Sequence, residues 1–227
     1  MNMTNPYTWL PLNSTASPKT QSIEFEGPAG WIEVLFDNPS SPSKGIVLIA
    51  HPQPLLGGSP RHKIPHTLAQ TLKASGWTCL RPYFRGVGNT EGRYDHGTGE
   101  TQDLLAIIAT LRAHNPATAL ILIGFSFGAY VIAKVAHTLQ QQGAPAQTTI
   151  LLSLPAGTVD AGRAYDTGSV PANSLIIHGE ADLQVPLRNV LIWAGSFKHP
   201  IVVFPGADHF FKGHEKTLIQ KITEAIK

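Results

Sequence analysis

The residues with the clearest chemical potential lie in the segment Gly124-Phe125-Ser126-Phe127-Gly128. The apolar run Ala119–Ile123 precedes it, and Ala129–Ala133 continues with the character of a buried helix. A sharp strand-to-helix turn of this kind holds its serine hydroxyl clear of the sheet, while the glycines let the two elements pass closely. The pattern predicts a nucleophilic serine. Because G-x-S-x-G is a common pattern, a purely structural turn is the alternative.

A serine hydroxyl is a weak nucleophile at neutral pH and needs a base beside it. Two further polar segments, His178–Asp182 and Gly206–His209, each follow a short apolar run that predicts a strand. Since the carboxyl ends of parallel strands meet at one edge of a sheet, we expect both segments to lie near Ser126. We predict His209 as the base and Asp182 as the carboxylate that orients it, in the chain order serine, acid, histidine.

Other residues compete for these roles: His51 and His178 for the base, and Glu180 and Asp208 for the acid. His178 precedes the proposed acid on the same turn, which favours a structural role. Asp208 is adjacent to His209, and this spacing seldom lets a carboxylate reach the far ring nitrogen. Asp95 and Asp103 follow a different strand, and we interpret them as local polar structure.

The tetrahedral intermediate of acyl transfer needs two N–H donors for its oxygen. One is expected from Phe127, directly after the serine, and one from the loop after the apolar run Gly45–Ala50. In His51-Pro52-Gln53-Pro54 the prolines have no N–H, so Gln53 carries the only backbone donor between them. The sequence therefore predicts the Phe127 and Gln53 amides, with Leu55 or Leu56 as the alternative to Gln53.

Segments typical of strands and helices alternate from residue 45 to the end of the chain. Before them, Ser22–Glu26 and Trp31–Phe36 predict a hairpin that turns at Gly27–Gly30. This order indicates one mostly parallel sheet of about eight strands with helices on both faces. We assign residues 1–21 to an irregular lead-in and residues 22–227 to one α/β domain. Residues 155–172 lack periodicity and are expected to cross the sheet edge.

Composition disfavours several classes of partner. The formal net charge of the 227 residues is +2 without a dense Lys/Arg run, so nucleic acid and anionic membranes are not expected as partners. No stretch approaches the ~20 apolar residues of a membrane span. Residues 1–22 lack the pattern of a secretory signal, and a cytoplasmic location is expected.

The cysteine and histidine content argues against disulfides and metal. Cys79 is the single cysteine, so an internal disulfide is impossible, and its apolar setting predicts a buried, unreactive thiol. The 10 histidines show no spacing typical of metal ligands. Neither a metal nor an organic cofactor is expected.

The glycine-rich stretch Arg85–Gly99 does not match a nucleotide-binding loop. Gly86-x-Gly88 followed by Gly92 misses the G-x-G-x-x-G spacing, and no G-K-[ST] follows. We expect instead a buried polar network that braces the site, formed by Arg85, Asp95, His96 and Glu100.

From about residue 22 onward the chain resembles the α/β-hydrolase superfamily. Several motifs are similar to those of a compact bacterial group of predicted hydrolases near the dienelactone-hydrolase-like esterases. They are Glu26–Gly30, His51-Pro52-x-Pro54-Leu55-x-Gly57-Gly58, Phe84–Gly88, Glu91-Gly92 and Asp95–Gly97. The resemblance implies the α/β-hydrolase fold without a cap domain.

The chain differs from that bacterial group at two places. It also differs from the dienelactone hydrolases in its nucleophile. Gln53 stands where histidine is frequent in the group, and Ser59–His62 also differs. Dienelactone hydrolases use a cysteine nucleophile, whereas the turn here carries Ser126 and Cys79 lies elsewhere. That activity is therefore disfavoured.

Together the motifs predict a serine hydrolase that cleaves small carboxylic esters through an acyl-enzyme. The absence of a cap predicts an open site for small acyl groups. We expect an apolar pocket lining of Leu55, Leu56, Pro155, Val185 and Phe210. A thioesterase or small peptidase with the same residues, or a scaffold that binds a ligand or protein without turnover, are the alternatives. The sequence does not determine the oligomeric state.

Overall fold

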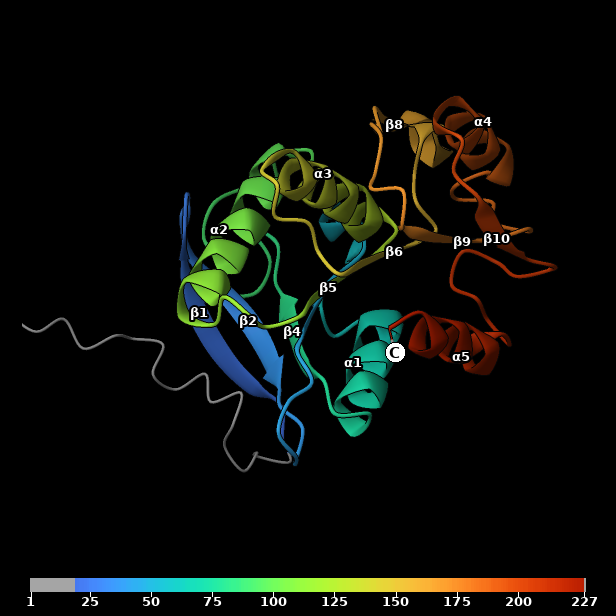
Figure 1. Cartoon of the computed structure of the whole chain (residues 1–227). Coiled ribbons are helices and arrows are strands. Elements are labelled where there is room, and N and C mark those ends of the chain that lie inside the picture. The colour runs from blue at the N-terminus through green and yellow to red at the C-terminus, as the bar shows by residue number, and fades with distance from the viewer. Residues whose placement is uncertain (1–18, 227) are drawn as a thin grey trace, which may run out of the picture.

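The computed structural model describes residues 19–226 of the chain (Figure 1). Residues 1–18 of the expected lead-in and Lys227 lie outside the described residues. The central element is an eight-stranded sheet with the strand order β1-β2-β4-β3-β5-β6-β9-β10. Its strands are β1 (Gln21–Gly27), β2 (Gly30–Asp37), β3 (Ile46–Ala50), β4 (Thr78–Pro82), β5 (Leu120–Phe125), β6 (Thr148–Leu152), β9 (Leu175–Gly179) and β10 (Ile201–Phe204).

The predicted N-terminal hairpin is present, and the rest of the sheet is parallel. β1 pairs with β2 and β2 pairs with β4 in antiparallel orientation, whereas every pairing from β4 to β10 is parallel. The carboxyl ends of β3, β5, β6, β9 and β10 consequently lie along the same edge. The α/β fold class is confirmed.

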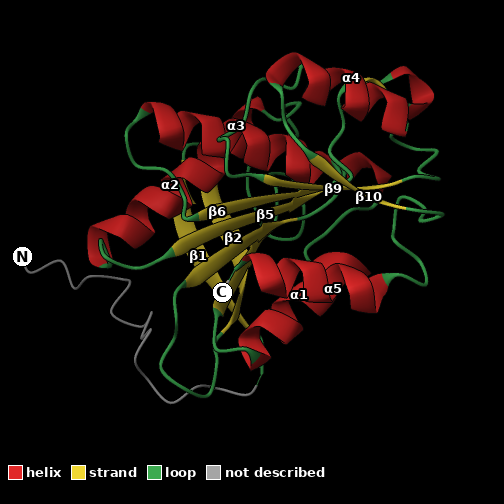
Figure 2. Cartoon of the chain, turned by 45° about the vertical axis from the view of Figure 1, so that its right-hand side comes forward, coloured by secondary structure: helices red, strands yellow, loops and turns green. Residues whose placement is uncertain are grey.

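Helices cover both faces of the sheet, as Figure 2 shows. They are α1 (Lys63–Ala74), α2 (Thr98–His114), α3 (Phe127–Gln141), α4 (Leu187–Phe197) and α5 (Glu215–Ala225). α1 and α5 pack on one face, and α2, α3 and α4 pack on the other (Figure 2). Each face thereby has its own apolar core.

The strand β5 shows how the sequence produces these two cores. All six of its residues are buried, as expected for a parallel strand covered on both faces. Successive side chains of a strand point to opposite faces. Leu120 and Leu122 accordingly enter the core beneath α2 and α3, while Ile121, Ile123 and Phe125 enter the core beneath α1 and α5.

The segment between β6 and β9 forms a small hairpin rather than a cap domain. Its strands are β7 (Gly157–Thr158) and β8 (Ala164–Tyr165), with a short 3-10 helix η2 (Asp160–Gly162) between them. Two-residue strands are too short to produce a periodic pattern, which is why the sequence predicts only an excursion here. Among the described helices, none combines the length and apolar character that crossing a bilayer requires.

Candidate active site

Ser126 occupies the turn between β5 and α3 in a strained backbone conformation. Its φ is 55° and its ψ is −123°, a region that costs energy for a residue with a side chain. Its N–H donates to the carbonyl of Leu152 on the neighbouring strand, with an N···O distance of 2.9 Å. This bond ties the strained residue to the sheet.

The two glycines around Ser126 allow two different close approaches. A Cβ on Gly124 would collide with the backbone of Gly128 and Ala129, so Gly124 lets α3 pass over the end of β5. A Cβ on Gly128 would collide with the carbonyl groups of Ala50 and His51. Gly128 therefore lets the first turn of α3 touch the start of the loop after β3.

The structure brings together the three residues predicted as nucleophile, base and acid. His209 Nε2 lies 3.0 Å from Ser126 Oγ, and His209 Nδ1 lies 2.7 Å from Asp182 Oδ2. Asp182 Oδ1 accepts hydrogen bonds from the N–H groups of Gln184 and Val185 at 2.9 and 2.8 Å. With both of its oxygens engaged, the carboxylate is held facing the imidazole.

The hydrogen-bonded series Ser126, His209 and Asp182, called the relay below, specifies the histidine tautomer that base catalysis needs. An ionised carboxylate only accepts hydrogen bonds, so His209 Nδ1–H donates to Asp182. The other ring nitrogen, Nε2, is then left to accept the Ser126 proton. The rings of Phe125 and Phe210 flank His209 with centroid distances of 5.2 and 5.1 Å. They restrict the imidazole to this orientation.

The Ser153 side chain holds the backbone of His209 in place. This buried residue follows β6 with a φ of 48°, and its hydroxyl donates to the His209 carbonyl at 3.2 Å. Its N–H donates to Ile177 O at 3.0 Å. The sequence contains no local signal for this role, because it depends on a contact between residues 56 positions apart.

The alternative bases are engaged elsewhere. His51 is fully buried; its Nδ1 donates to Pro52 O at 2.7 Å and its Nε2 accepts the Phe84 N–H at 3.0 Å. Burial lowers the pKa of His51 to about 3, so the ring stays neutral. His178 Nε2 donates to Val185 O at 2.9 Å, and burial lowers the His178 pKa as well. Both histidines hold the backbone of neighbouring loops.

The alternative acids stabilise turns. Glu180 accepts the Gly206 N–H at 2.9 Å. Asp208 accepts the N–H groups of Phe210 and Lys212 at 3.0 and 2.9 Å. Because these bonds shape the loops around His209, both carboxylates have a local structural use.

The two amides predicted to bind an oxyanion have no acceptor within residues 19–226, since neither the Gln53 N–H nor the Phe127 N–H donates a hydrogen bond there. The Gln53 carbonyl closes its loop by accepting the N–H groups of Leu56 and Gly58 at 3.1 and 2.9 Å. The Leu56 amide, one alternative donor, is thereby consumed. Gln53 and Ser126 lie on the same pocket.

That pocket is an open depression of about 390 Å³ beside Ser126 and His209. Its other lining residues are Pro52, Gln53, Leu56, Gly57, Gly58, His62, Arg163, Gln184 and Phe210. Of the predicted apolar lining, Leu56 and Phe210 lie on the pocket. His62, Arg163 and Gln184 were not anticipated, because they come from loops and a helix start without a periodic pattern.

The other three predicted lining residues do not line the pocket. Leu55 points away on the short 3-10 helix η1 (Pro54–Leu56) and is 69% exposed. Val185 is buried in the core beneath α4, and its backbone is used by Asp182 and His178. Pro155 is also buried, and its carbonyl accepts the Thr167 hydroxyl proton at 2.6 Å. Their nearness in sequence to strand ends did not determine where their side chains point.

The polar network expected in Arg85–Gly99 exists with different partners. Arg85 pairs with Asp103 through two bonds of 2.7 and 2.8 Å, and this pairing raises the pKa of Arg85. Glu100 accepts the N–H groups of Asp95 and Gly97, both at 2.8 Å. His96 is exposed and stays outside the network, so including it was wrong. The network fixes the start of α2.

Cys79 is buried, as predicted, and burial raises the pKa of its thiol. A thiol that resists ionisation is a poor nucleophile. Within residues 19–226, no three side chains of the types His, Cys, Asp and Glu are grouped closely enough to hold a metal ion.

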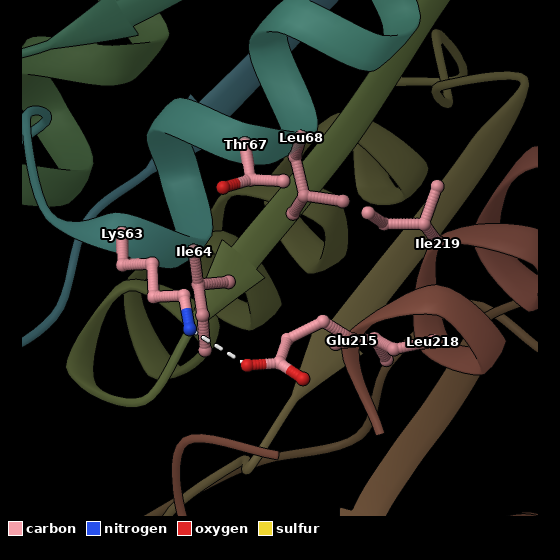
Figure 3. Close-up of a pocket in the computed structure, with 7 residues that line it drawn as sticks. All are labelled: Lys63, Ile64, Thr67, Leu68, Glu215, Leu218 and Ile219. Carbon is pink, nitrogen blue, oxygen red and sulfur yellow. Dashed lines mark hydrogen bonds and ion pairs between the residues drawn. The ribbon is translucent and has the colours of Figure 1, made fainter. Parts of the chain in front are cut away.

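A second hollow, of about 480 Å³, lies between α1 and α5 (Figure 3). Its lining residues are Lys63, Ile64, Thr67, Leu68, Glu215, Leu218 and Ile219. Lys63 Nζ and Glu215 Oε1 are 2.7 Å apart across it. The hollow is larger than the pocket at Ser126, but its walls offer no base beside a nucleophile. Among the described residues of the two hollows, a serine beside a histidine is found only at the smaller one.

Comparisons with known proteins agree with the fold. Residues 55–149 match the family model described as the alpha/beta hydrolase fold. An uncharacterized protein of Rickettsia prowazekii is 32% identical over 201 residues, which cover 84% of this chain and 82% of that protein.

Two solved structures are similar over nearly their whole length. One, from Xanthomonas campestris, is described as a serine hydrolase without a lid. It has a TM-score of 0.80 and 30% identity, and the match covers 94% of this chain and 96% of that one. The other is an alpha-beta serine hydrolase homologue from Coxiella burnetii. Its TM-score is 0.77 and its identity 32%, with coverage of 91% and 97%.

Proposed function

This chain belongs to the α/β-hydrolase superfamily, as its motifs implied, and from that membership we propose that it is a serine hydrolase of small carboxylic esters. The observation that carries the proposal is the relay in which Ser126, His209 and Asp182 are joined by contacts of 3.0 and 2.7 Å. The relay ends at a hydroxyl on an open pocket, where a substrate can reach it.

In the proposed reaction Ser126 Oγ attacks the ester carbonyl while His209 Nε2 takes its proton. Asp182 stabilises the imidazolium that forms. The carbonyl oxygen becomes an oxyanion, for which the unused N–H groups of Phe127 and Gln53 are the donors. His209 then protonates the leaving alcohol, and a water molecule, activated by the same histidine, releases the acid from the acyl-enzyme.

The size and walls of the pocket support small substrates. A depression of about 390 Å³, partly open to solvent, leaves little enclosed space for a long acyl chain. The segment between β6 and β9, where a cap could be inserted, forms only the β7–β8 hairpin. We infer that acyl groups of a few carbon atoms fit best.

A fluorophosphonate probe tests the proposal directly, because it reacts with an activated serine. We expect labelling of the wild-type protein and none of Ser126→Ala, with Ser196→Ala, at an exposed serine of α4, as the control. A folded wild-type protein that resists the probe would instead support a scaffold that binds without turnover.

A substrate panel then separates the chemical classes. Phenyl esters of increasing acyl length, the matching thioesters and the matching anilides are compared by kcat/KM. The proposal expects the highest values for short esters. A preference for thioesters or anilides would identify a thioesterase or a peptidase that uses the same residues.

A further inference from the structure

Arg163 is the charged side chain that faces the pocket at Ser126. Among the described residues that line this pocket, it is the only Lys or Arg, and none is Asp or Glu. His209 and Ser126 lie on the same pocket. A substrate bound at the nucleophile is therefore exposed to one unopposed positive charge.

The guanidinium of Arg163 has unused donors. Its Nε donates to the Asp160 carbonyl at 3.2 Å, and within residues 19–226 it forms no ion pair with a carboxylate. Arg81 and Arg85, by contrast, each bind a carboxylate through two bonds. A guanidinium carries five N–H donors arranged to match a carboxylate. Arg163 uses part of this set on the Asp160 carbonyl and the Tyr165 hydroxyl, and none of it on a carboxylate of residues 19–226.

The hairpin that carries Arg163 is fixed beside the acid of the relay. The Arg163 carbonyl accepts the Val159 N–H at 2.8 Å, which closes the hairpin turn. The Asp160 N–H donates at 3.1 Å to the carbonyl of Gln184, the residue whose own N–H holds Asp182. The position of Arg163 relative to the relay is thus set by hydrogen bonds and does not depend on a free loop.

Polar groups continue from Arg163 to the oxyanion loop. Gln53 Nε2 donates to the hydroxyls of Tyr94 and Tyr165 at 3.1 and 3.3 Å, while Gln53 Oε1 is buried without a partner among the described residues. Burial raises the pKa of the Tyr165 phenol, and the charge of Arg163 opposes that rise. Arg163, Tyr165 and Gln53 therefore form one connected polar side of the site.

The pocket also has an apolar lining. Leu56 and Phe210 contribute to it, and the ring centroids of His62 and Phe210 are 5.5 Å apart. A substrate that suits both kinds of lining has an apolar part and an anionic part.

We propose that the ester cleaved at Ser126 carries a carboxylate a few atoms from its carbonyl, and that Arg163 binds this carboxylate. The proposal rests on the ester hydrolysis proposed above and adds a substrate class, the half-esters of small dicarboxylic acids and the esters of carboxylate-bearing alcohols.

The test compares esters that differ in charge but have similar size. Phenyl hydrogen glutarate has a carboxylate on its acyl group, and phenyl pentanoate is its neutral counterpart. meta-Acetoxybenzoate has a carboxylate on its alcohol part, and meta-tolyl acetate is its neutral counterpart. We expect wild-type kcat/KM to favour the anionic member in at least one pair, and that pair identifies the arm that Arg163 binds.

Three variants assign the preference to Arg163. In Arg163→Met the ratio of kcat/KM for the anionic over the neutral ester should fall about 10- to 100-fold, as expected for a charge-assisted hydrogen bond. Arg163→Lys should retain part of the preference through its charge. Arg188→Met, which removes an exposed charge from the nearby helix α4, should leave the ratio unchanged.

The outcomes separate this inference from the proposed function. If the wild type cleaves neutral esters as well as anionic ones and Arg163→Met leaves the ratio unchanged, the inference is wrong while ester hydrolysis stands. If no ester is cleaved and the fluorophosphonate does not label Ser126, both fail. A further measurement uses the wild-type protein alone. If free glutarate slows labelling of Ser126 by the fluorophosphonate, and high salt weakens this protection, carboxylate binding at the site is supported.

Discussion

Two buried carboxylates, one at the end of β2 and one in the loop after β9, differ in where their hydrogen bonds lead. The side chains of Asp37 and Asp182 are both fully buried. Asp37 accepts two bonds from Arg81, one from Gln70 and one from Thr20, with lengths between 2.6 and 3.1 Å. None of these partners lines the pocket at Ser126.

The bonds of Asp182 lead instead to the surface. Two come from backbone amides, and the third comes from His209, which in turn contacts the Ser126 hydroxyl on the pocket. Burial of a charge is therefore a poor indicator of a functional site in this protein. The useful indicator is a buried hydrogen-bond chain whose last member can meet a substrate.

The comparison also explains the ionisation of Asp37. Burial favours the neutral carboxyl, but the hydrogen bonds from Thr20, Arg81 and Gln70 and the charge of Arg81 outweigh it and lower the pKa of Asp37. Its charge is thus retained for structure. If the two carboxylates differ in this way, a substitution at Asp182 should mainly lower activity. A substitution at the partner of Asp37 should mainly lower the free energy of unfolding.

The largest effect is expected from Asp182→Asn. An amide cannot hold His209 in the tautomer that accepts the serine proton, so kcat should fall about 10³- to 10⁴-fold. The urea midpoint should change little, because the side-chain oxygen can still accept the two backbone bonds. Kinetics with the best panel ester measure the first quantity. A loss below about tenfold would reassign the acid.

Arg81→Met is expected to show the reverse pattern. Removing the guanidinium leaves Asp37 buried without its counter-charge, which should cost about 3–5 kcal/mol of unfolding free energy. Activity per folded molecule should stay near that of the wild type. Urea unfolding, with Arg188→Met as a matched control, measures the loss. A drop in kcat without a drop in stability would contradict the structural role of this pair.

Acid should weaken the fold through His51. Its pKa is about 3 in the folded protein against an ordinary value of 6.5, so below pH 6.5 the unfolded chain binds a proton that the folded chain excludes. Stability from this group is present above pH 6.5 and falls by up to about 1.4 kcal/mol per pH unit as the pH drops. Burial lowers the pKa of His178 too, so it acts in the same direction.

Urea unfolding between about pH 6.5 and 4.5 measures this histidine effect apart from that of the Asp37 carboxyl, which titrates only at lower pH. His51→Gln can keep one donor and one acceptor while losing the titration. Its stability should depend less on pH over that window. An equally steep dependence in this variant would place the titrating group elsewhere.

The smallest effect is expected from Glu180→Gln. Glu180 is the rival acid in the sequence, but its carboxylate binds only the exposed Gly206 N–H at 2.9 Å among the described residues. We expect kcat/KM within about twofold of the wild type, as for an ordinary surface substitution. A loss comparable to that of Asp182→Asn would show that both carboxylates serve His209.

The sequence anticipated the elements around the site because each has a local signature. Ser126 lies between an unbroken apolar strand and an apolar helix. Asp182 and His209 each follow a strand end, and parallel strands bring their carboxyl ends together whatever the loop lengths. The predicted lining residues Pro155 and Val185 also come after strands, but both side chains are buried and neither lines the pocket.

The sequence alone thus predicted the sheet, the order of Ser126, Asp182 and His209 along the chain, and the edge of the sheet at which they meet. These follow from local periodicity and from the geometry of parallel strands. The folded chain alone shows that Asp103 and not Asp95 pairs with Arg85. It also shows that Arg163 lines the pocket at Ser126 and forms no ion pair with a carboxylate of residues 19–226. Such contacts join loops far apart in the chain, and side-chain direction in a loop is set by the packing of its neighbours rather than by a repeating pattern.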